Sequence, residues 1–311
     1  MKTPDSLPPH PQESIGAVSG GPELARLFNQ DIKRRAQPRC KLSGLATGFP
    51  ALDALLDGLQ YGQQTIIAAQ LSVGKTTLGL NIVEQVCLVD QIPTAIISLE
   101  MSGTELLRRL CAAHCHIPLR SLRAGSYAKG KFPKLTHFEA TLQTAPLFLF
   151  DPLRGATAEH IAALVRRLVR EQGVRFVLLD NVQKVKISGR EAQRADEVGE
   201  ASAILKAMAV ENDIALLTLA HLNREPEQYE GRIPRLADLA DSAQIERNAD
   251  TIAILHRDRT HEGQHAPAAL LVAKHRDGET GMVKLTFDGQ HCRFNDPPLV
   301  EEGCGPVPKA A

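Results

Sequence analysis

Residues 65–84, TIIAAQLSVGKTTLGLNIVE, decide how this chain folds. The apolar run at 65–69 predicts a buried strand, and the run from Lys75 to Glu84 predicts a helix. The loop between them ends in Gly74, Lys75 and Thr76. A strand, a short loop ending in Gly-Lys-Thr and a helix together make the context that a phosphate-binding P-loop requires. We therefore expect an α/β domain built around a nucleotide-phosphate site.

The residue types in this loop suit that chemistry. Backbone N–H groups and the helix N-terminus hold phosphate oxygens, and glycine lets the backbone approach closely. Lys75 can neutralise the β- and γ-phosphates of ATP, and the Thr76 hydroxyl can bind Mg²⁺. Ala69 stands where the usual pattern begins with glycine, so the strict motif fails at one position. The predicted nucleotide-binding residues are Ser72, Val73, Gly74, Lys75, Thr76 and Thr77.

Composition narrows the class of protein without indicating a partner. The chain has 311 residues, enough for one large domain or two small ones, and Lys+Arg equals Asp+Glu at 36 each. Net charge therefore gives no sign of nucleic acid, and any such binding would need a local patch. No apolar run approaches the roughly 20 residues of a membrane span, and the proline-rich N-terminus lacks the features of a signal peptide. We expect a cytoplasmic protein with no membrane partner.

The two ends of the chain differ from its middle. Residues 1–21 and 296–311 are rich in proline and glycine, which is typical of disordered tails. An apolar stripe at helical spacing predicts a helix at 22–36, within a linker at 22–40. This helix would pack either on its own domain or on a neighbouring subunit. The folded domain is expected to occupy residues 41–295.

Strand and helix patterns alternate along that domain. A mostly parallel sheet with helices on both faces follows from short apolar strands separated by helices. The segment 281–294 predicts a C-terminal hairpin that turns at Asp288-Gly289. We expect strands near 65–69, 94–99, 146–150, 175–180, 215–220, 251–256 and 268–274, and helices near 75–89, 102–115, 157–172 and 195–212.

Two acidic residues follow predicted strands, at the carboxyl ends where ligands bind in open α/β sheets. Glu100 follows the strand after the P-loop helix, where a carboxylate can activate the water that attacks the γ-phosphate. It can equally be a surface residue that opens the next helix, since acidic residues favour helix starts. Asp180 ends four apolar residues, which is the Walker-B arrangement that holds Mg²⁺.

Three basic residues also follow predicted strands. His221 can sense whether a γ-phosphate is present, or it can be an ordinary hydrogen-bonded residue at a strand end. Lys274 and Arg276 point the same way on an extended strand. They lie too far along the chain to reach their own nucleotide, so they either reach a neighbour's site as arginine fingers or form a solvated basic strand end.

A possible nucleic-acid surface follows Asp180. Basic side chains in that loop can hold a phosphate backbone, although a charge-rich loop is also commonly just solvated. Few aromatic residues lie nearby, so base stacking on a platform is not indicated. The candidate DNA-binding residues are Lys184, Lys186, Arg190 and Arg194.

Taken in order, these segments resemble the motifs of the DnaB-type replicative helicase C-terminal domain. The likeness covers roughly residues 44–294, most of the chain. It is carried by the P-loop and by the segments TGFPALD at 47–53, SLEM at 98–101, LLDNVQ at 178–183, LNR at 222–224, QIERNAD at 244–250 and KHRDG at 274–278.

The resemblance implies a RecA-like fold, a hexameric ring of identical subunits, and movement on single-stranded DNA driven by ATP with Mg²⁺. It implies that Lys75 and Thr76 bind phosphate and Mg²⁺, that Glu100 is the catalytic base and that Asp180 is the Walker-B acid. His221 matches the γ-phosphate sensor, and Lys274 and Arg276 match residues that enter the neighbouring subunit's site. The segment 22–36 matches the helix that docks on the adjacent subunit.

The chain also departs from the family pattern. Asn181-Val182 stands where the bacterial helicases have Tyr-Leu, and Ala240-Asp241-Ser242-Ala243 stands where the DNA-contacting loop has Arg-Glu-Ser-Gly. Residues 1–40 are expected to hold only tail and linker, with no counterpart of the N-terminal domain that forms the collar and binds primase in the bacterial enzymes.

We expect a replicative-type helicase or translocase motor that hydrolyses ATP between subunits, with primase or a loader as a possible partner. The alternative is a nucleotide-gated regulatory or accessory ATPase without unwinding activity. A recombination ATPase of the RecA or RadA type fits the fold but fits the segments at 98–101 and 274–278 less well.

Overall fold

A computed structural model describes residues 25–26, 42–126, 129–151, 155–189, 194–222, 235–239, 242–257 and 266–297. The chain divides into two compact units, Met1–Ser43 and Gly44–Ala311. The expected tail at 1–21, most of that at 296–311 and nearly all of the linker at 22–40 lie outside the described residues. Within the linker only Ala25 and Arg26 are described, and both are helical.

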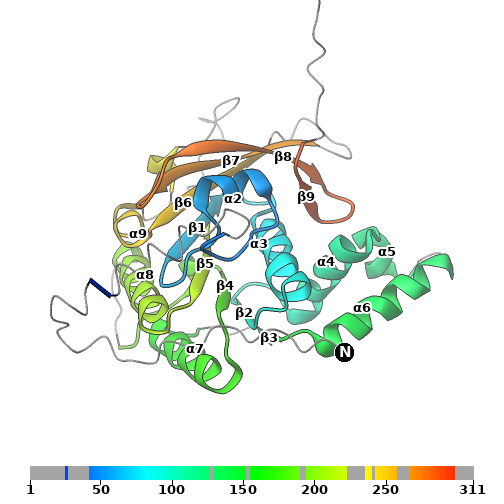
Figure 1. Cartoon of the computed structure of the whole chain (residues 1–311), viewed down its shortest axis with the longest axis horizontal. Coiled ribbons are helices and arrows are strands. Elements are labelled where there is room, and N and C mark those ends of the chain that lie inside the picture. The colour runs from blue at the N-terminus through cyan, green and yellow to red at the C-terminus, as the bar shows by residue number, and fades with distance from the viewer. Residues whose placement is uncertain are drawn as a thin grey trace, which may run out of the picture. The chain divides into compact units, whose positions relative to one another are not determined.

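The second unit is built on one nine-stranded sheet (Figure 1). Its order is β3-β2-β4-β5-β1-β6-β7-β8-β9, in which the first six strands pair in parallel and the last three are antiparallel. This confirms the predicted mostly parallel sheet. The strands are β1 Gln64–Ala69, β2 Thr94–Ser98, β3 Leu147–Phe150, β4 Phe176–Asp180, β5 Ala215–His221, β6 Thr251–Arg257, β7 Ala266–His275, β8 Gly281–Asp288 and β9 Arg293–Asn295.

Helices connect the strands and cover both faces of the sheet (Figure 1). No helix among the described ranges combines the length and apolar character needed to cross a bilayer. Sequence patterns missed four of the α-helices: α2, α5, α6 and α9. The helices are α2 Pro50–Leu56, α3 Lys75–Val83, α4 Gly103–Cys115, α5 Leu119–Ala124, α6 Phe132–Thr144, α7 Ala158–Gln172, α8 Arg194–Glu211 and α9 Ser242–Asn248; short π and 3₁₀ segments are η1 Glu84–Val89, η2 Lys129–Lys131, η3 Val182–Lys184 and η5 Leu236–Asp238.

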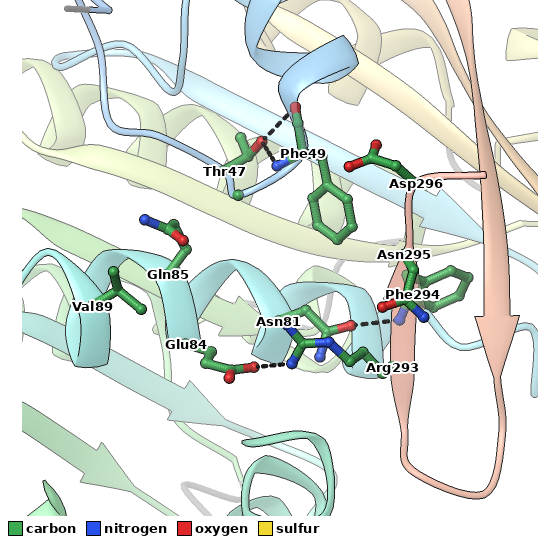
Figure 2. Close-up of a pocket in the computed structure, with 11 residues that line it drawn as sticks. Thr47, Phe49, Asn81, Glu84, Gln85, Val89, Arg293, Phe294, Asn295 and Asp296 are labelled. Atoms are coloured by element: carbon green, nitrogen blue, oxygen red, sulfur yellow. Dashed lines mark hydrogen bonds and ion pairs between the residues drawn. The ribbon is translucent and has the colours of Figure 1, made fainter. Parts of the chain in front are cut away.

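The C-terminal hairpin forms, but its turn differs from the prediction. Asp288 pairs with Arg293, so the loop contains four residues rather than turning at Asp288-Gly289. The carboxylate of Asp288 accepts hydrogen bonds from the backbone N–H groups of Gln290 and His291, which holds the longer loop together. The last strand then docks on α3, where the N–H of Phe294 donates to the side chain of Asn81 (Figure 2).

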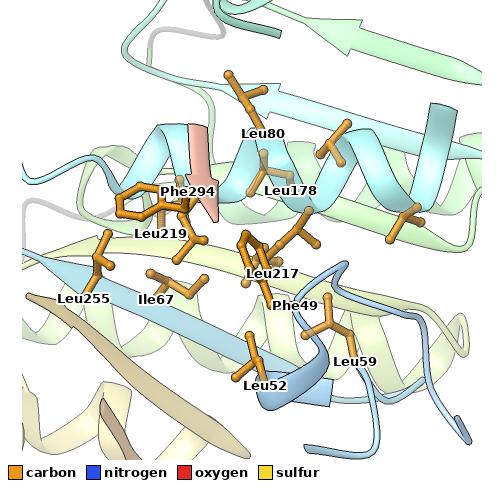
Figure 3. Packing of buried hydrophobic residues seen from close by; sticks show 14 of the residues in the cluster. Phe49, Leu52, Leu59, Ile67, Leu80, Leu178, Leu217, Leu219, Leu255 and Phe294 are labelled. Atoms are coloured by element: carbon orange, nitrogen blue, oxygen red, sulfur yellow. The ribbon is translucent and has the colours of Figure 1, made fainter. Parts of the chain in front are cut away.

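Alternation along the strands divides the core into two layers. On β1, Ile67 and Ala69 belong to the layer beneath α2, α3 and α4, whereas Ile66 and Ala68 belong to the layer beneath α7, α8 and α9. Successive side chains of a strand point to opposite faces, and a strand covered on both sides is therefore apolar throughout. Figure 3 shows the first layer, where Phe294 joins residues from the central strands.

Candidate functional site

The loop between β1 and α3 has a backbone that only particular residues allow. Gly74, the residue before α3, has φ +115° and ψ +21°. A Cβ atom there would lie 3.0 Å from Cζ and 3.1 Å from Cε2 of Phe294. Glycine is therefore required at this position for two reasons: the positive φ angle, and the packing of β9 against the loop.

Lys75 projects from the first turn of α3 into a cluster of polar side chains. Its Nζ lies 3.2 Å from Nε2 of His221, 3.8 Å from Oδ1 of Asp180 and 4.0 Å from Oε2 of Glu100. The lysine is 6% exposed, and this burial lowers its pKa. Each of these contacts is longer than the roughly 2.7–2.9 Å of a strong charge-assisted hydrogen bond.

Asp180 lies beneath the P-loop because β4 ends there. The Thr76 hydroxyl donates to Oδ2 of Asp180 at 2.7 Å. Asp180 is 1% exposed, and burial raises its pKa. On β2, Ser98 pairs with Asp180, and the N–H of Leu99 donates to the carbonyl of Asp180. These contacts hold the loop that carries Glu100 against β4.

Glu100 and His221 meet at the surface of this cluster. Oε1 of Glu100 lies 3.4 Å from Nε2 of His221. The hydrogen bond with His221, opposed by partial burial and aided by the charge of Lys75, lowers the pKa of Glu100 to about 2. The carboxylate is therefore ionised at neutral pH and is a ready acceptor of hydrogen bonds.

Several buried polar atoms in the cluster have no hydrogen-bond partner within the described part of the chain. Oδ1 of Asp180 and both amide atoms of Asn181 are buried with no hydrogen bond among the described residues. The amide of Asn181 does lie close enough to Glu100 to contribute to its low pKa. Buried polar atoms without partners are costly, which indicates that this site is built to receive polar atoms from outside the chain.

Arg257 supports the P-loop from β6, and no sequence motif pointed to it. Its guanidinium donates to the carbonyls of Ser72 at 3.2 Å and Val73 at 3.4 Å. It also lies over the ring of Phe287, 4.5 Å from the ring centroid. Parallel pairing of β1 with β6 places the end of β6 beside the P-loop. Local sequence patterns do not predict which strands are neighbours, so they do not predict this contact.

The basic residues after Asp180 are only partly described. Lys184 and Lys186 are exposed and, with Leu99, Glu100 and Gly155, line an open cavity of about 530 Å³. Arg190 and the side chain of Arg194 lie outside the described residues. Two lysines, Lys184 and Lys186, therefore lie in the same cavity as Glu100.

Lys274 and Arg276 lie away from this cluster, at the other edge of the sheet. The sequence predicts that they follow a strand at the edge where ligands bind in a parallel sheet, but β7 is antiparallel to β6, so its carboxyl end lies beside the start of β1. The six residues of β1 separate the two edges by about 17 Å at ~3.3 Å per residue. Neither side chain is therefore directed at the P-loop of its own subunit.

A second, smaller cavity is separate from the P-loop cluster. It has a volume of about 310 Å³ and lies between α3, η1 and β9. Figure 2 shows Arg293 paired with Glu84 and the side chain of Asn81 bonded to the backbone of β9 along its wall. Because these polar groups are already paired within the chain, we assign no ligand to this cavity.

The P-loop, the Asp180 strand end and the mostly parallel sheet define a P-loop NTPase domain with a RecA-like fold. The chain belongs to the family of DnaB-like helicase C terminal domains, whose model matches residues 44–296. It is 36% identical over 258 residues to the replicative DNA helicase DnaB of Leifsonia xyli, covering 82% of this chain and 56% of that protein. It is 34% identical over 257 residues to the replicative DNA helicase DnaC of Bacillus subtilis, covering 81% of this chain and 56% of that protein.

Solved structures agree with this assignment. A DnaB-like replicative helicase, described with its interactions with primase, superposes with a TM-score of 0.80 at 27% identity, covering 90% of this chain and 68% of the other. A solved ATPase domain superposes with a TM-score of 0.82 at 27% identity, covering 90% of this chain and all of the other. The chain spans about half the length of the curated relatives it matches.

Proposed function

We propose that this protein is an ATP-dependent DNA helicase or translocase motor of the replicative DnaB type. The observation that carries the proposal is the meeting of Lys75, Thr76, Glu100, Asp180 and His221 in one cluster at the carboxyl edge of the sheet. An ammonium group, a hydroxyl and two carboxylates in this arrangement suit the hydrolysis of a nucleoside triphosphate.

Lys75 is the proposed phosphate ligand. Its ammonium is buried, and its protein contacts are all long. A triphosphate would give this charge closer partners than the chain does, and Lys75 would neutralise charge that develops on the β- and γ-phosphates. The N–H groups of residues 72–77 would hold the same oxygens.

The residues also fit Mg²⁺. The Thr76 hydroxyl and the Asp180 carboxylate are hard oxygen ligands held 2.7 Å apart, and Oδ1 of Asp180 has no hydrogen-bond partner among the described residues. Thr76 would bind the ion directly and Asp180 would hold it through water. When bound, the ion would shield the phosphate charge.

Glu100 is the proposed general base. Its low pKa keeps it ionised, so it can orient a water molecule for attack on the γ-phosphorus and accept its proton as the bond to the β-phosphate oxygen breaks. His221 bridges Glu100 and Lys75, a position from which it would feel whether a γ-phosphate has displaced those contacts. We propose that it is the sensor.

The rest of the site would come from another subunit. Lys274 and Arg276 lie at the sheet edge opposite their own P-loop, which supports an assembly of identical subunits in which they reach a neighbour's nucleotide. We propose a hexameric ring on single-stranded DNA, with Lys184, Lys186, Arg190 and Arg194 as backbone contacts. Primase or a loader remains a candidate partner, since one structural relative is described with primase.

A specific departure favours a second candidate function. Residues 240–243 read Ala-Asp-Ser-Ala, which removes the arginine and glycine of the family's DNA-contacting loop. A nucleotide-gated accessory ATPase that does not unwind DNA would tolerate this change.

Two measurements test the proposal. ATP turnover is measured with and without single-stranded DNA, and strand displacement is measured on a tailed duplex. We expect turnover that single-stranded DNA stimulates, together with displacement, and we expect Lys75→Ala to abolish both. Lys284→Ala removes an exposed lysine on β8 and is the matched control. Turnover indifferent to DNA, with no displacement, would favour the accessory ATPase; normal turnover by Lys75→Ala would refute the site.

A further inference from the structure

The basic pair at the end of β7 is held by the carboxyl end of α9. Nζ of Lys274 donates to the backbone carbonyls of Glu246 and Ala249 at 2.5 and 2.6 Å. Carbonyls at a helix C-terminus have no partner within the helix and carry partial negative charge. The ammonium of Lys274 satisfies two of them, so the position of this side chain depends on α9.

Asp250 holds the second member of the pair. Its Oδ1 accepts a hydrogen bond from Nη1 of Arg276 at 3.1 Å, and its carbonyl accepts one from the N–H of Arg276 at 2.9 Å. The side chain of Arg276 is nevertheless 51% exposed, whereas that of Asp250 is 4% exposed. A buried carboxylate therefore anchors a guanidinium that is still half exposed, and Nη2 of that guanidinium donates to the carbonyl of Arg247 at 3.4 Å.

The carboxylate of Asp250 is itself fixed from two other elements. Its Oδ2 accepts from Nζ of Lys206 on α8 at 2.5 Å and from the N–H of Gln64 on β1 at 2.8 Å. Asp250 thus joins a helix, the first strand and the basic strand end. We call the carbonyls of Glu246 and Ala249 with the carboxylate of Asp250 the α9 socket.

We propose that Asp250 is a positioning residue for the neighbouring subunit's reaction, because the α9 socket fixes Lys274 and Arg276 at the surface from which they reach that subunit's nucleotide. The proposal rests on the interface site proposed above. A long arginine side chain loses considerable rotamer freedom when it is held in one place. The socket removes much of that freedom before the subunits meet, so less is lost when the phosphate is engaged.

Mixing inactive variants tells whether Asp250 acts on its own subunit or on the next one. Lys75→Ala removes the phosphate ligand but keeps the basic pair, whereas Asp250→Asn keeps the phosphate ligand. In a random equal mixture, half of the Asp250→Asn subunits have a Lys75→Ala neighbour on the donating side. If Asp250 acts across the interface, those subunits recover, and the mixture turns over ATP at about a quarter of the wild-type rate per subunit, as head-to-tail contacts in a ring require.

The mixture of Lys75→Ala with Arg276→Ala calibrates the experiment. If this pair recovers activity and the pair with Asp250→Asn also recovers, the proposal is supported. If only the Arg276→Ala mixture recovers, Asp250 acts within its own subunit and the proposal is overturned. If neither mixture recovers, the interface site itself is refuted, and the positioning role fails with it.

Two further variants control for misfolding and for the general effect of breaking an ion pair. Asp250→Glu keeps a negative charge beside Lys206 and replaces Asp250→Asn in the same mixtures if that variant does not fold. Asp213→Asn is the matched control, because it breaks an ion pair of the same type, with Arg175 at 3.3 Å, far from the basic pair in sequence. We expect Asp213→Asn alone to keep wild-type turnover.

Discussion

Replacing Gly74 with alanine tests the construction of the P-loop. The residue has φ +115°, and forcing an L-residue into left-handed backbone costs about 1–2 kcal/mol. The new Cβ would also lie 3.0 Å from Phe294. That ring is 2% exposed and packs on Phe287 with ring centroids 4.6 Å apart, so it has little room to move, and overpacking of this kind costs roughly 1–3 kcal/mol. We expect Gly74→Ala to lower the free energy of unfolding by about 2–5 kcal/mol in all.

A glycine elsewhere in the chain separates the two causes. Gly125, which follows α5, has φ +63°, and a Cβ there would meet nothing within 4 Å. Gly125→Ala therefore measures backbone strain alone, about 1 kcal/mol. Urea unfolding gives the stability of each variant, and binding of a fluorescent ATP analogue tests whether the P-loop keeps its conformation. The affinity for this analogue should fall only in Gly74→Ala.

The ring contact is isolated by a double-mutant cycle. Gly74→Ala is combined with Phe294→Leu, which makes space for the Cβ, and the combined loss should be smaller than the sum of the two single losses. The reasoning is refuted if Gly74→Ala costs no more than Gly125→Ala, or if the two changes in the cycle are additive, because Phe294 would then place no limit on the loop.

Three further predictions concern the charged groups of the site. The pKa of Glu100 is about 2 in the folded protein, below its ordinary value of 4.5. The ionised carboxylate therefore stabilises the fold at pH values above 4.5, and this contribution is lost as the pH falls toward 2. The difference in unfolding free energy between wild type and Glu100→Gln, measured in urea, should shrink between about pH 5 and 3, and a constant difference would contradict the lowered pKa. At neutral pH, Glu100→Gln should bind ATP and not hydrolyse it. Arg257→Leu removes the two hydrogen bonds to the P-loop carbonyls and should weaken ATP binding by about tenfold, or ~1–2 kcal/mol. The control is Arg175→Leu, which loses a similar stacking contact with Tyr61; equal effects on ATP binding would show that Arg257 has no special role.

Local patterns were sufficient for the central sheet. The strand, loop and helix of the P-loop are adjacent in sequence, and the parallel strands are largely apolar runs. Several of them end in a polar residue, as β2 does at Ser98, β4 at Asp180 and β5 at His221. Because parallel strands end at one edge, Lys75, Glu100 and His221 could be expected together, and the structure brings them within 4.0 Å of one another.

Features that depend on distant pairing were not readable. The strand around 268–274 was expected, but its direction is fixed by antiparallel pairing with β6, and this places Lys274 and Arg276 at the far edge. The loop after Asp288 is lengthened by hydrogen bonds to that carboxylate, which outweigh the Asp-Gly preference for a tight turn. Helix α6 has one buried residue, Phe138, so its apolar periodicity was too weak to predict.

A pair of hydrogen bonds links His221, in the cluster around Lys75, to the segment that follows Asp180, although the two are far apart in sequence. The side chain of Gln183, in η3, donates from Nε2 to the carbonyl of His221 at 3.2 Å and accepts from its N–H at 3.1 Å. A pair of hydrogen bonds to one backbone unit resembles a rung of a sheet, so the end of β5 cannot shift without either carrying η3 with it or breaking both bonds. Because Lys184 is the next residue in η3 and lines the cavity beside Glu100, a displacement of His221 would reach this lysine through a single side chain. Under the sensor role proposed above, loss of a γ-phosphate would cause such a displacement.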